Sequence, residues 1–363
     1  MKGRVPNNIA SCWPSSIPVR ALSIPARLQT DTLTHRSAFT GRTDVLQVTK
    51  NVDCVVRKNV LAVHERRRQP FLHVIVTPDM TNCHKLRQSW DHVRCRSDKD
   101  VLENVDINAI RQLLHSVGPR ARKKGVMWFF QQMLKLGAVA HGIDGLSEHV
   151  RVMDGETILL KSFDWFTRKG NEIFDICDTW IAARVGDGFN HARYGALYYQ
   201  LTRRATVGSP ALVAHGMSMT RTNVRAMLQA FSPRDTSWRS NEWVSNSLKR
   251  LCDQSAVTGF SEYYYYASWV LFDHVTGRNG TDAPSPLVRM SSDTCKRVET
   301  RTRQCNASLE RTTALYSKYA YVVFEDHASR TRDVSPNNRS DFPTALSRET
   351  PALGARLTRA ENG

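Results

Sequence analysis

A strand–helix–strand pattern near residue 50 constrains the fold of this chain more than any other feature. Residues 45–48 form a short apolar run, and residues 71–76 form a second one that ends at Thr-Pro-Asp. Residues 51–64 between them carry valines at helical spacing, which predicts an amphipathic helix. This order predicts a parallel pair of strands joined by a right-handed crossover. The chain is therefore expected to belong to the α/β class.

The rest of the sequence predicts one domain with polar ends. At 363 residues the chain is long enough to bury a substantial core. Residues 1–43 are rich in Ser, Pro, Arg and Thr, and residues 329–363 are polar and basic, so both ends are expected to be disordered. The expected division is a leader at 1–43, a folded domain at 44–328 and a tail at 329–363. The leader lacks the apolar core of a secretory signal, which leaves a disordered tail or an organellar transit peptide.

Charge and cysteine usage limit the partners and the compartment. The formal charge of +17 requires an anionic partner, which leaves nucleic acid, an acidic membrane and phosphorylated small molecules open. No apolar run approaches the ~18 residues that a membrane span needs. The eight cysteines form no C-x-x-C pair and are expected to be single thiols of a reducing compartment. A cytoplasmic location is predicted, with an organellar one as the alternative.

One loose cluster of metal-binding residue types stands out among these cysteines. Cys83, His84, His92 and Cys95 lie close together in the sequence. Their spacing matches no standard zinc pattern, so scattered loop residues are the preferred interpretation.

Two carboxylates separated by one residue follow an apolar run near the middle of the chain. Asp154 and Glu156 come at the end of a predicted strand, where ligands bind in an open α/β sheet. Residues i and i+2 of an extended segment point the same way, so the pair could hold a divalent cation. The alternative is a β-hairpin, because Asp-Gly between two apolar runs is a strong hairpin signal.

Three further segments place polar side chains in apolar surroundings. Residues 126–140 are predicted to be helical, with Gln131 and Lys135 on one face. Residues 211–219 are predicted to form a strand with His215 in its interior. Ser261 is a suitable N-cap for a helix that begins at Glu262. The structural alternatives are a solvated helix face, a core histidine and compensation of the helix dipole.

Four motifs occur in order along the chain. They are Trp-Phe-Phe-Gln-Gln-Met-Leu-Lys at 128–135, Val-Met-Asp-Gly-Glu-Thr-Ile-Leu-Leu at 152–160, Val-Ala-His-Gly-Met at 213–217 and Gly-Phe-Ser-Glu-Tyr at 259–263. Together they resemble the Gln-Gln helix, D-x-D strand end, Val-x-His-x-Met strand and Ser-Glu-Tyr motif of a poorly characterised family of bacterial and algal glycosyltransferases. The likeness covers roughly residues 44–275. It implies a GT-A-like, Rossmann-like fold with a mixed, mostly parallel sheet flanked by helices.

The resemblance also implies a reaction and a set of site residues. The reaction is transfer of a sugar from a nucleotide-diphosphate donor to an unknown glycan, lipid or small-molecule acceptor, with Mn²⁺ or Mg²⁺ at Asp154 and Glu156. The donor is expected over the first strand–helix unit. The expected donor contacts are Asp53, Gln132, Lys135 and Asp154, with residues 122–124 as weaker diphosphate candidates.

The expected catalytic residues are Glu262, as general base, and His215, as a third metal ligand or an acceptor-site group. Tyr263, Tyr264, Tyr265 and Tyr266 are candidates for stacking on a sugar ring, and the alternative is that they lie mostly in the core and at its rim.

Three alternatives to an active transferase remain open. The second aspartate of the D-x-D motif is Glu156 here, which leaves a degenerate, inactive copy possible. A metal-dependent hydrolase would share the carboxylates but would not need the unit at residues 44–80. Nucleic-acid binding is disfavoured, because no binding module is recognisable and much of the excess charge lies in the predicted tails.

Overall fold

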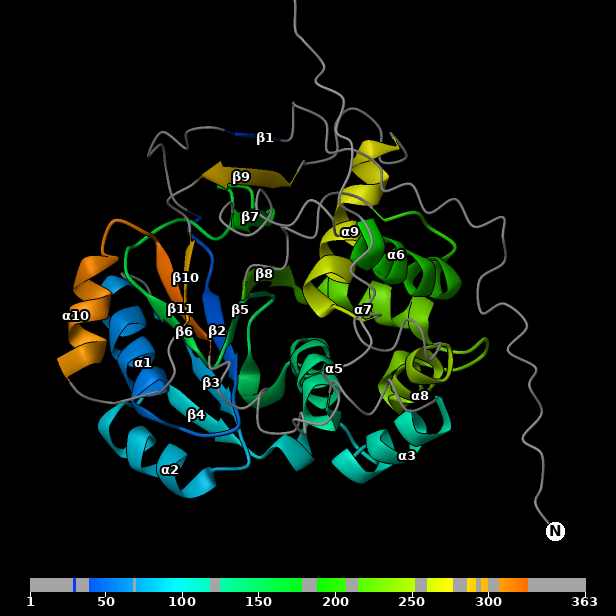
Figure 1. Ribbon diagram of the computed structural model, residues 1–363, viewed down its shortest axis with the longest axis horizontal. Helices are drawn as coiled ribbons and strands as arrows, with labels where there is room; N and C mark the ends of the chain where they lie inside the picture. Colours follow the sequence, from blue (N-terminus) through cyan, green and yellow to red (C-terminus); the bar gives the residue numbers. More distant parts are fainter. Residues whose placement is uncertain are drawn as a thin grey trace, which may run out of the picture.

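The computed structural model is built around a five-stranded sheet (Figure 1). The strand order is β4-β3-β2-β5-β8; the first four strands run parallel, and β8 is antiparallel to β5. These strands are β2 (Thr43–Val48), β3 (His73–Val76), β4 (Val93–Arg96), β5 (His149–Asp154) and β8 (Gly216–Thr220). The expected mixed, mostly parallel sheet is confirmed. The structure describes residues 29–30, 39–67, 70–117, 125–177, 188–206, 215–251, 260–276, 286–291, 295–299 and 307–325.

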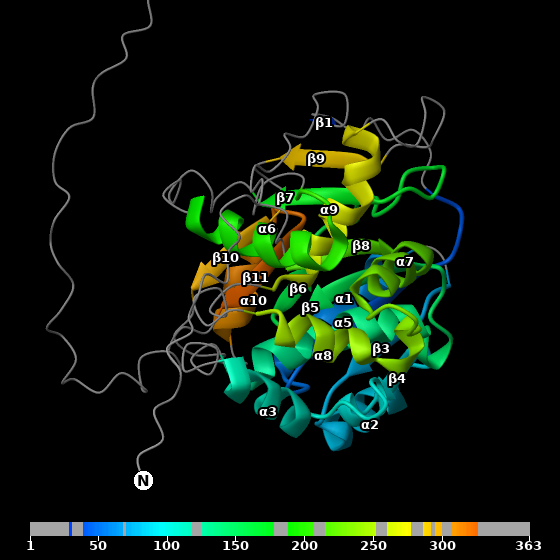
Figure 2. The same ribbon diagram turned by 90° about the vertical axis from the view of Figure 1, so that its right-hand side faces the viewer.

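Alternating side chains of β2 explain how helices cover both faces of this sheet. Leu46 and Val48 are buried in one core with helix α5 (Val126–His141), whereas Val45 is buried in another with α1 (Cys54–Arg66). Helix α2 (Met80–Ser89) lies on the α1 side. The α5 side, which faces the viewer in Figure 2, also carries α3 (Ile107–Val117), α7 (Arg221–Phe231), α8 (Glu242–Lys249) and α9 (Glu262–Val275).

Two smaller sheets flank the central one. They contain β6 (Thr157–Leu159), β10 (Cys295–Glu299) and β11 (Tyr321–Glu325) in one, and β1 (Gln29–Thr30), β7 (Ile173–Cys177) and β9 (Leu287–Ser291) in the other. Helices α6 (Gly188–Thr202) and α10 (Ala307–Leu315) complete the described elements. The hairpin interpretation of Asp154-Gly155 is wrong, because β5 pairs with β2 and β8 while β6 pairs with β11. The chain changes sheets at this turn.

The strand predicted at residues 211–219 differs from the structure. His215 lies before β8 rather than inside a strand, with a left-handed φ of 54° that interrupts extended pairing. Residues 207–214, which belong to the same predicted strand, lie outside the described residues.

The division into a leader, a domain and a tail stays a prediction. Gln29 and Thr30 pair with β9, and the Phe39 ring lies 4.5 Å from the ring of His149. Residues 326–363 lie outside the described part of the chain. Among the helices that are described, none has the length and apolar character needed to cross a membrane.

The prediction of single thiols is wrong for Cys54, Cys83 and Cys95, which are all disulfide-bonded. Cys83 of α2 and Cys95 of β4 form a disulfide, with their Cα atoms 5.9 Å apart. The packing of the helix against the edge strand brings them together, and nothing in their sequence spacing indicates it. Disulfides are typical of oxidising compartments, whereas the cysteine spacing predicted the single thiols of a reducing one.

A buried polar network ties β2 to the end of β5. Gln47 Nε2 donates to the backbone oxygen of Asp154 at 3.2 Å, and Asn59 Nδ2 donates to Gln47 Oε1 at 3.3 Å. His73 Nε2 lies 3.2 Å from the same Gln47 oxygen. Asn59 Oδ1 in turn accepts from the backbone N–H of Leu159 in β6 at 2.9 Å. The network fixes the backbone on both sides of the turn that carries Glu156.

Acidification is expected to destabilise the protein through His73. Burial, with a smaller contribution from His92, lowers the pKa of His73 from 6.5 to about 3. Between pH 6.5 and about 3, His73 is therefore protonated in the unfolded chain but neutral in the folded protein. Stability should fall by about 1.4 kcal/mol for each pH unit below 6.5. Urea unfolding at pH 7 and pH 5.5 should show this loss of stability. The His73→Gln variant should lose much less stability between the two pH values. The same substitution at the exposed His84 is the control and should leave the pH dependence intact.

Candidate active site

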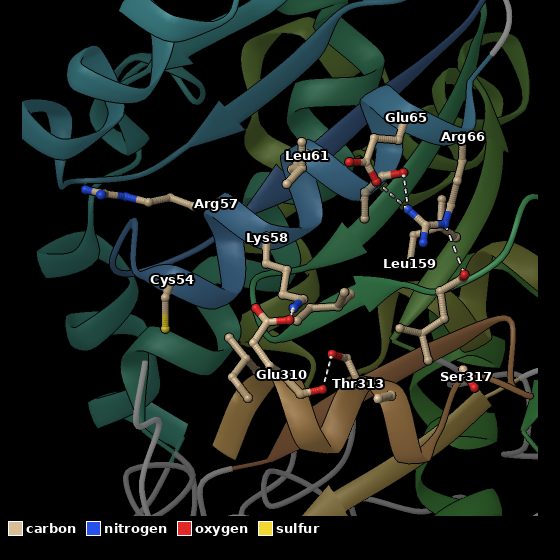
Figure 3. A pocket seen from close by; sticks show the side chains of 15 residues that line it. Cys54, Arg57, Lys58, Leu61, Glu65, Arg66, Leu159, Glu310, Thr313 and Ser317 are labelled. Atoms are coloured by element: carbon tan, nitrogen blue, oxygen red, sulfur yellow. Dashed lines mark hydrogen bonds and ion pairs between the residues drawn. The ribbon is translucent and has the colours of Figure 1, made fainter. Parts of the chain in front are cut away.

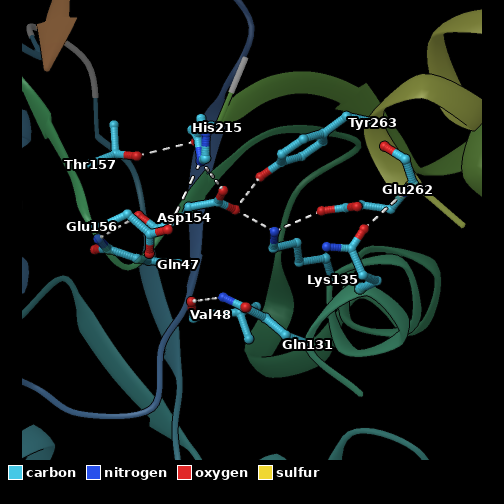
Figure 4. A network of polar contacts seen from close by, with 12 residues as sticks. Gln47, Val48, Gln131, Lys135, Asp154, Glu156, Thr157, His215, Glu262 and Tyr263 are labelled. Carbon is cyan, nitrogen blue, oxygen red and sulfur yellow. Dashed lines mark hydrogen bonds and ion pairs between the residues drawn. The ribbon is translucent and has the colours of Figure 1, made fainter. Parts of the chain in front are cut away.

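Asp154 is the centre of a polar cluster at the carboxyl end of β5 (Figure 4). Its Oδ1 accepts hydrogen bonds from Lys135 Nζ and, at 2.8 Å, from the hydroxyl of Tyr263. Its Oδ2 lies 2.7 Å from His215 Nδ1. The side chain is 10% exposed, so these partners replace most of its hydration. This carboxylate at the sheet edge is thereby held by groups from α5, from α9 and from His215, which precedes β8.

Lys135 links Asp154 to the first residue of α9. Its Nζ donates to Glu262 Oε1 at 2.6 Å, and both side chains are 2% exposed. The Ser261 hydroxyl accepts from the backbone N–H of Tyr264, which starts the helix at Glu262 as predicted. Gln132 Oε1 accepts from the Glu262 backbone N–H at 3.2 Å. Lys135 therefore joins α5 to α9 through Glu262 and to β5 through Asp154.

The charges of this cluster follow from its burial. Burial favours neutral Lys135, but Asp154 and Glu262 outweigh it and raise the pKa of the ammonium above its usual value. Burial would raise the pKa of Asp154, but Lys135 and His215 together lower it far below the ordinary range. For Glu262, burial and the negative charge of Asp154 raise the pKa despite Lys135. Asp154 and Lys135 are therefore the firmly charged pair, and Glu262 is the carboxyl that binds a proton more readily.

Three side chains of types that can ligate a metal ion converge at the end of β5. One ligand atom each of Asp154, Glu156 and His215 lies within 4.8 Å of the others. His215 Nδ1 is 3.9 Å from Glu156 Oε1, and the Glu156 side chain is 25% exposed. The left-handed backbone of His215 turns its carbonyl toward the Thr157 hydroxyl, which donates to it at 3.2 Å. Carboxylates suit Mg²⁺ or Mn²⁺, and the imidazole extends the set toward transition-metal ions.

A pocket of about 300 Å³ opens at the carboxyl ends of β2 and β3. Its opposite wall is the first half of α5, where Gln131 Nε2 donates to the backbone oxygen of Val48 at 3.0 Å. The pocket is lined by Val48, Thr49, Lys50, Val76, Pro78, Asp98, Gly125, Met127, Trp128, Phe130, Gln131 and Leu134. The pocket and the Asp154 cluster both lie at the carboxyl ends of the central strands, so one ligand can extend from the pocket to the cluster.

A larger hollow of about 750 Å³ lies elsewhere, between α1, β6 and α10 (Figure 3). Lys58 and Glu310 form an ion pair across it. None of the site residues predicted from the sequence lines it. The carboxylates, the imidazole and the buried lysine converge instead at the Asp154 cluster.

The structure brings most of the predicted site residues together. Lys135, Asp154, Glu156, His215 and Glu262 form the cluster, and Gln132 supports it through the Glu262 backbone. Residues 122–124 lie outside the described part of the chain.

Two other predicted positions have structural explanations. Asp53 is the N-cap of α1, and its Oδ1 accepts from the backbone N–H groups of Val55 and Val56. The prediction that the tyrosine run stacks on a sugar is wrong, because all four of its rings lie inside the core. Their exposures are 1% for Tyr263 and 0% for Tyr264, Tyr265 and Tyr266.

The sequence did not predict the supporting roles of Gln47 and the Tyr263 hydroxyl. Gln47 carried a weak signal, since a glutamine between apolar residues of a buried strand needs a polar partner. The Tyr263 contact depends on the packing of α9 against β5, which the sequence does not indicate.

No family model matches the chain, and neither does any curated protein. Solved structures similar to it include the galactosyltransferase LgtC in complex with donor and acceptor sugar analogues (12% identity, TM-score 0.35, 77% of this chain and 86% of that one). Mouse xyloside xylosyltransferase 1 gives 10% identity and a TM-score of 0.34 over 78% and 97%. A Pyrobaculum calidifontis mannosyltransferase, in complex with GDP-Man and Mn²⁺, gives 10% and 0.23 over 53% and 49%. These similar structures are glycosyltransferases, but scores this low do not decide the fold or the activity of this chain.

Proposed function

We propose that this protein transfers a sugar from a nucleoside-diphosphate donor to an acceptor hydroxyl. The observation that carries the proposal is the convergence of Asp154, Glu156 and His215 at the end of β5, beside the pocket at the ends of β2 and β3. The pocket is large enough for the nucleoside end of such a donor. The diphosphate would then lie toward the three ligating side chains.

Asp154, Glu156 and His215 are the proposed ligands of Mn²⁺ or Mg²⁺. Their oxygen and nitrogen atoms fit such an ion, with His215 releasing its hydrogen bond to Asp154 to ligate through Nδ1. When bound, the ion would neutralise charge on the departing diphosphate. Gln132, in this proposal, acts through Glu262 rather than on the donor directly. Asp53, the N-cap of α1, stays a proposed donor contact.

The buried residues have separate proposed tasks. Lys135 holds the Asp154 carboxylate in place and supplies a fixed positive charge close to the diphosphate. Glu262 is the proposed general base, because burial and the negative charge of Asp154 raise its pKa and make it the readier proton acceptor of the two carboxylates. It also anchors Lys135, so the two carboxylates and the ammonium act as one unit.

Glu156→Gln is expected to remove metal-dependent nucleotide binding. Glu156 is the better variant for this test, since Asp154 also pairs with buried Lys135 and its loss would disturb the fold. We expect the tightening of nucleoside-diphosphate binding by Mn²⁺ to weaken roughly 10- to 100-fold. Calorimetry with and without Mn²⁺ measures this. Glu310→Gln, in the larger hollow, is the control and should bind the nucleoside diphosphate as tightly as the parent does. If Glu310→Gln lost this binding and Glu156→Gln kept it, the proposed site would be contradicted.

A further inference from the structure

Asp98 is a buried carboxylate that lines the 300 Å³ pocket. It follows β4 and begins the short turn Asp98–Asp100, which Ser97 caps. The residue is only 9% exposed, and its Oδ1 is shielded from solvent without accepting a hydrogen bond. Within the described residues, no hydrogen bond or ion pair to either carboxylate oxygen is present. Asp53 and Asp79, which also follow strands of this sheet edge, both cap helices.

The described residues supply no partner for this carboxylate, which leaves a ligand of the pocket as a source of one. Burial of an ionised group without hydrogen bonds is costly, and native proteins rarely retain one without a use. An ionised carboxylate only accepts hydrogen bonds. Its natural partner in the pocket is therefore a ligand group that presents N–H donors, and two adjacent donors satisfy both oxygens at once.

Among the common nucleobases, guanine alone offers two adjacent donors on one edge, at N1–H and the 2-amino group. Uracil presents one N–H between two carbonyls, whose oxygens a carboxylate repels. Adenine and cytosine present an amino group beside a ring nitrogen that is itself an acceptor. We propose that Asp98 makes the donor site selective for a guanosine-diphosphate sugar, an inference that rests on the proposed function of this site.

Two other residues of the pocket suit the same base. Lys50 lines the pocket and can donate to the O6 of guanine, the acceptor next to N1–H. Trp128 lies half-buried in the α5 wall and offers an aromatic face for the ring system. No described residue forms a hydrogen bond or ion pair with Asp98, so its carboxylate can turn about χ2 and bring the shielded Oδ1 toward the base.

The test measures binding of GDP, IDP, UDP and ADP to the full chain in the presence of Mn²⁺. GDP should bind roughly 10- to 100-fold more tightly than UDP or ADP, because only guanine satisfies both oxygens. IDP lacks the 2-amino group and should fall between them. Tighter binding of UDP or ADP than of GDP overturns the assignment.

Asp98→Asn provides a sharper second measurement. An asparagine amide offers one acceptor and one donor, which matches xanthine, whose position 2 is a carbonyl. The variant should lose GDP affinity roughly 10- to 100-fold and gain affinity for XDP. Its melting temperature without nucleotide should not fall, because the substitution removes an unpaired buried charge. Unchanged GDP affinity in this variant overturns the proposal.

The outcomes also separate this inference from the proposed function. If UDP or ADP is preferred and that binding still depends on Glu156 and Mn²⁺, the guanine assignment fails and the transferase proposal stands. If no nucleoside diphosphate binds, both fail.

Discussion

Lys135→Met is expected to lower the free energy of unfolding by about 3–5 kcal/mol at pH 8. Met has nearly the same volume, so the loss comes from charge rather than from a cavity. Asp154 and Glu262 would then face each other in the core without the ammonium that now bridges them. Urea unfolding of the variant and the parent chain measures the difference.

The pH dependence of this loss identifies its cause. Without Lys135, the pKa of Glu262, which burial and Asp154 already raise, must rise further. A carboxyl whose folded pKa exceeds its unfolded value stabilises the fold at low pH and ceases to do so as pH rises through the folded pKa. The deficit of the variant relative to the parent should therefore shrink between pH 8 and pH 5. A deficit that stays constant would contradict the role given to the two carboxylates.

Lys58→Met is the matched control. Lys58 pairs with Glu310, and the two side chains are 21% and 72% exposed. A surface pair of this kind contributes at most about 1 kcal/mol. An equal loss in both variants would mean that the methionine itself, rather than the buried charge, is responsible.

The parts of the fold that the sequence predicted depend on local signals. The apolar run of β2, the valine spacing of α1 and the turn after β3 lie within one short stretch, and together they specify a parallel unit. The cap at Ser261 likewise depends on a few neighbouring residues. Local pattern and tertiary structure agree at these positions, so the prediction succeeds.

The parts that it did not predict depend on distant packing. Asp154-Gly155 has the sequence of a hairpin turn, but β2 and β8 already pair with β5, and the chain continues into a different sheet. His215 adopts a left-handed backbone conformation, in which its carbonyl accepts hydrogen bonds from the N–H of Asp154 and the hydroxyl of Thr157. The disulfide between Cys83 and Cys95 likewise requires knowing that α2 lies against β4.

The candidate site follows the same division. The order of the four motifs pointed to the residues that converge, but not to their contacts. Lys135 was expected to contact a diphosphate, and the structure pairs it with Glu262, 127 positions away. Sequence separation of that size carries no local signal. The buried ion pair therefore depends on the packing of α5 against α9, which the sequence does not indicate.

Glu262→Gln is expected to lower turnover by roughly 10²- to 10⁴-fold, the range that general-base catalysis supplies. Glutamine keeps the volume of the side chain and an oxygen that can accept from Lys135 Nζ, so Lys135 and Asp154 should stay in place. Affinity for the nucleoside diphosphate and Mn²⁺ should barely change, because neither is bound by Glu262. The assay is release of nucleoside diphosphate from the nucleotide sugar that binding identifies.

A positioning role for Glu262 would give a different pattern from the same variant. If its carboxylate matters only by holding Lys135, and through it Asp154, the substitution should weaken Mn²⁺ binding, and saturating Mn²⁺ should restore turnover. Asp273→Asn is the control on the same helix, since Asp273 is 27% exposed and pairs with Arg204 at 3.2 Å. Full turnover in Glu262→Gln together with a large loss in Asp273→Asn would transfer the role of base to Asp273. Loss of turnover in Glu262→Gln alone, at saturating Mn²⁺, assigns the proton transfer to Glu262, because only that residue has lost a proton acceptor.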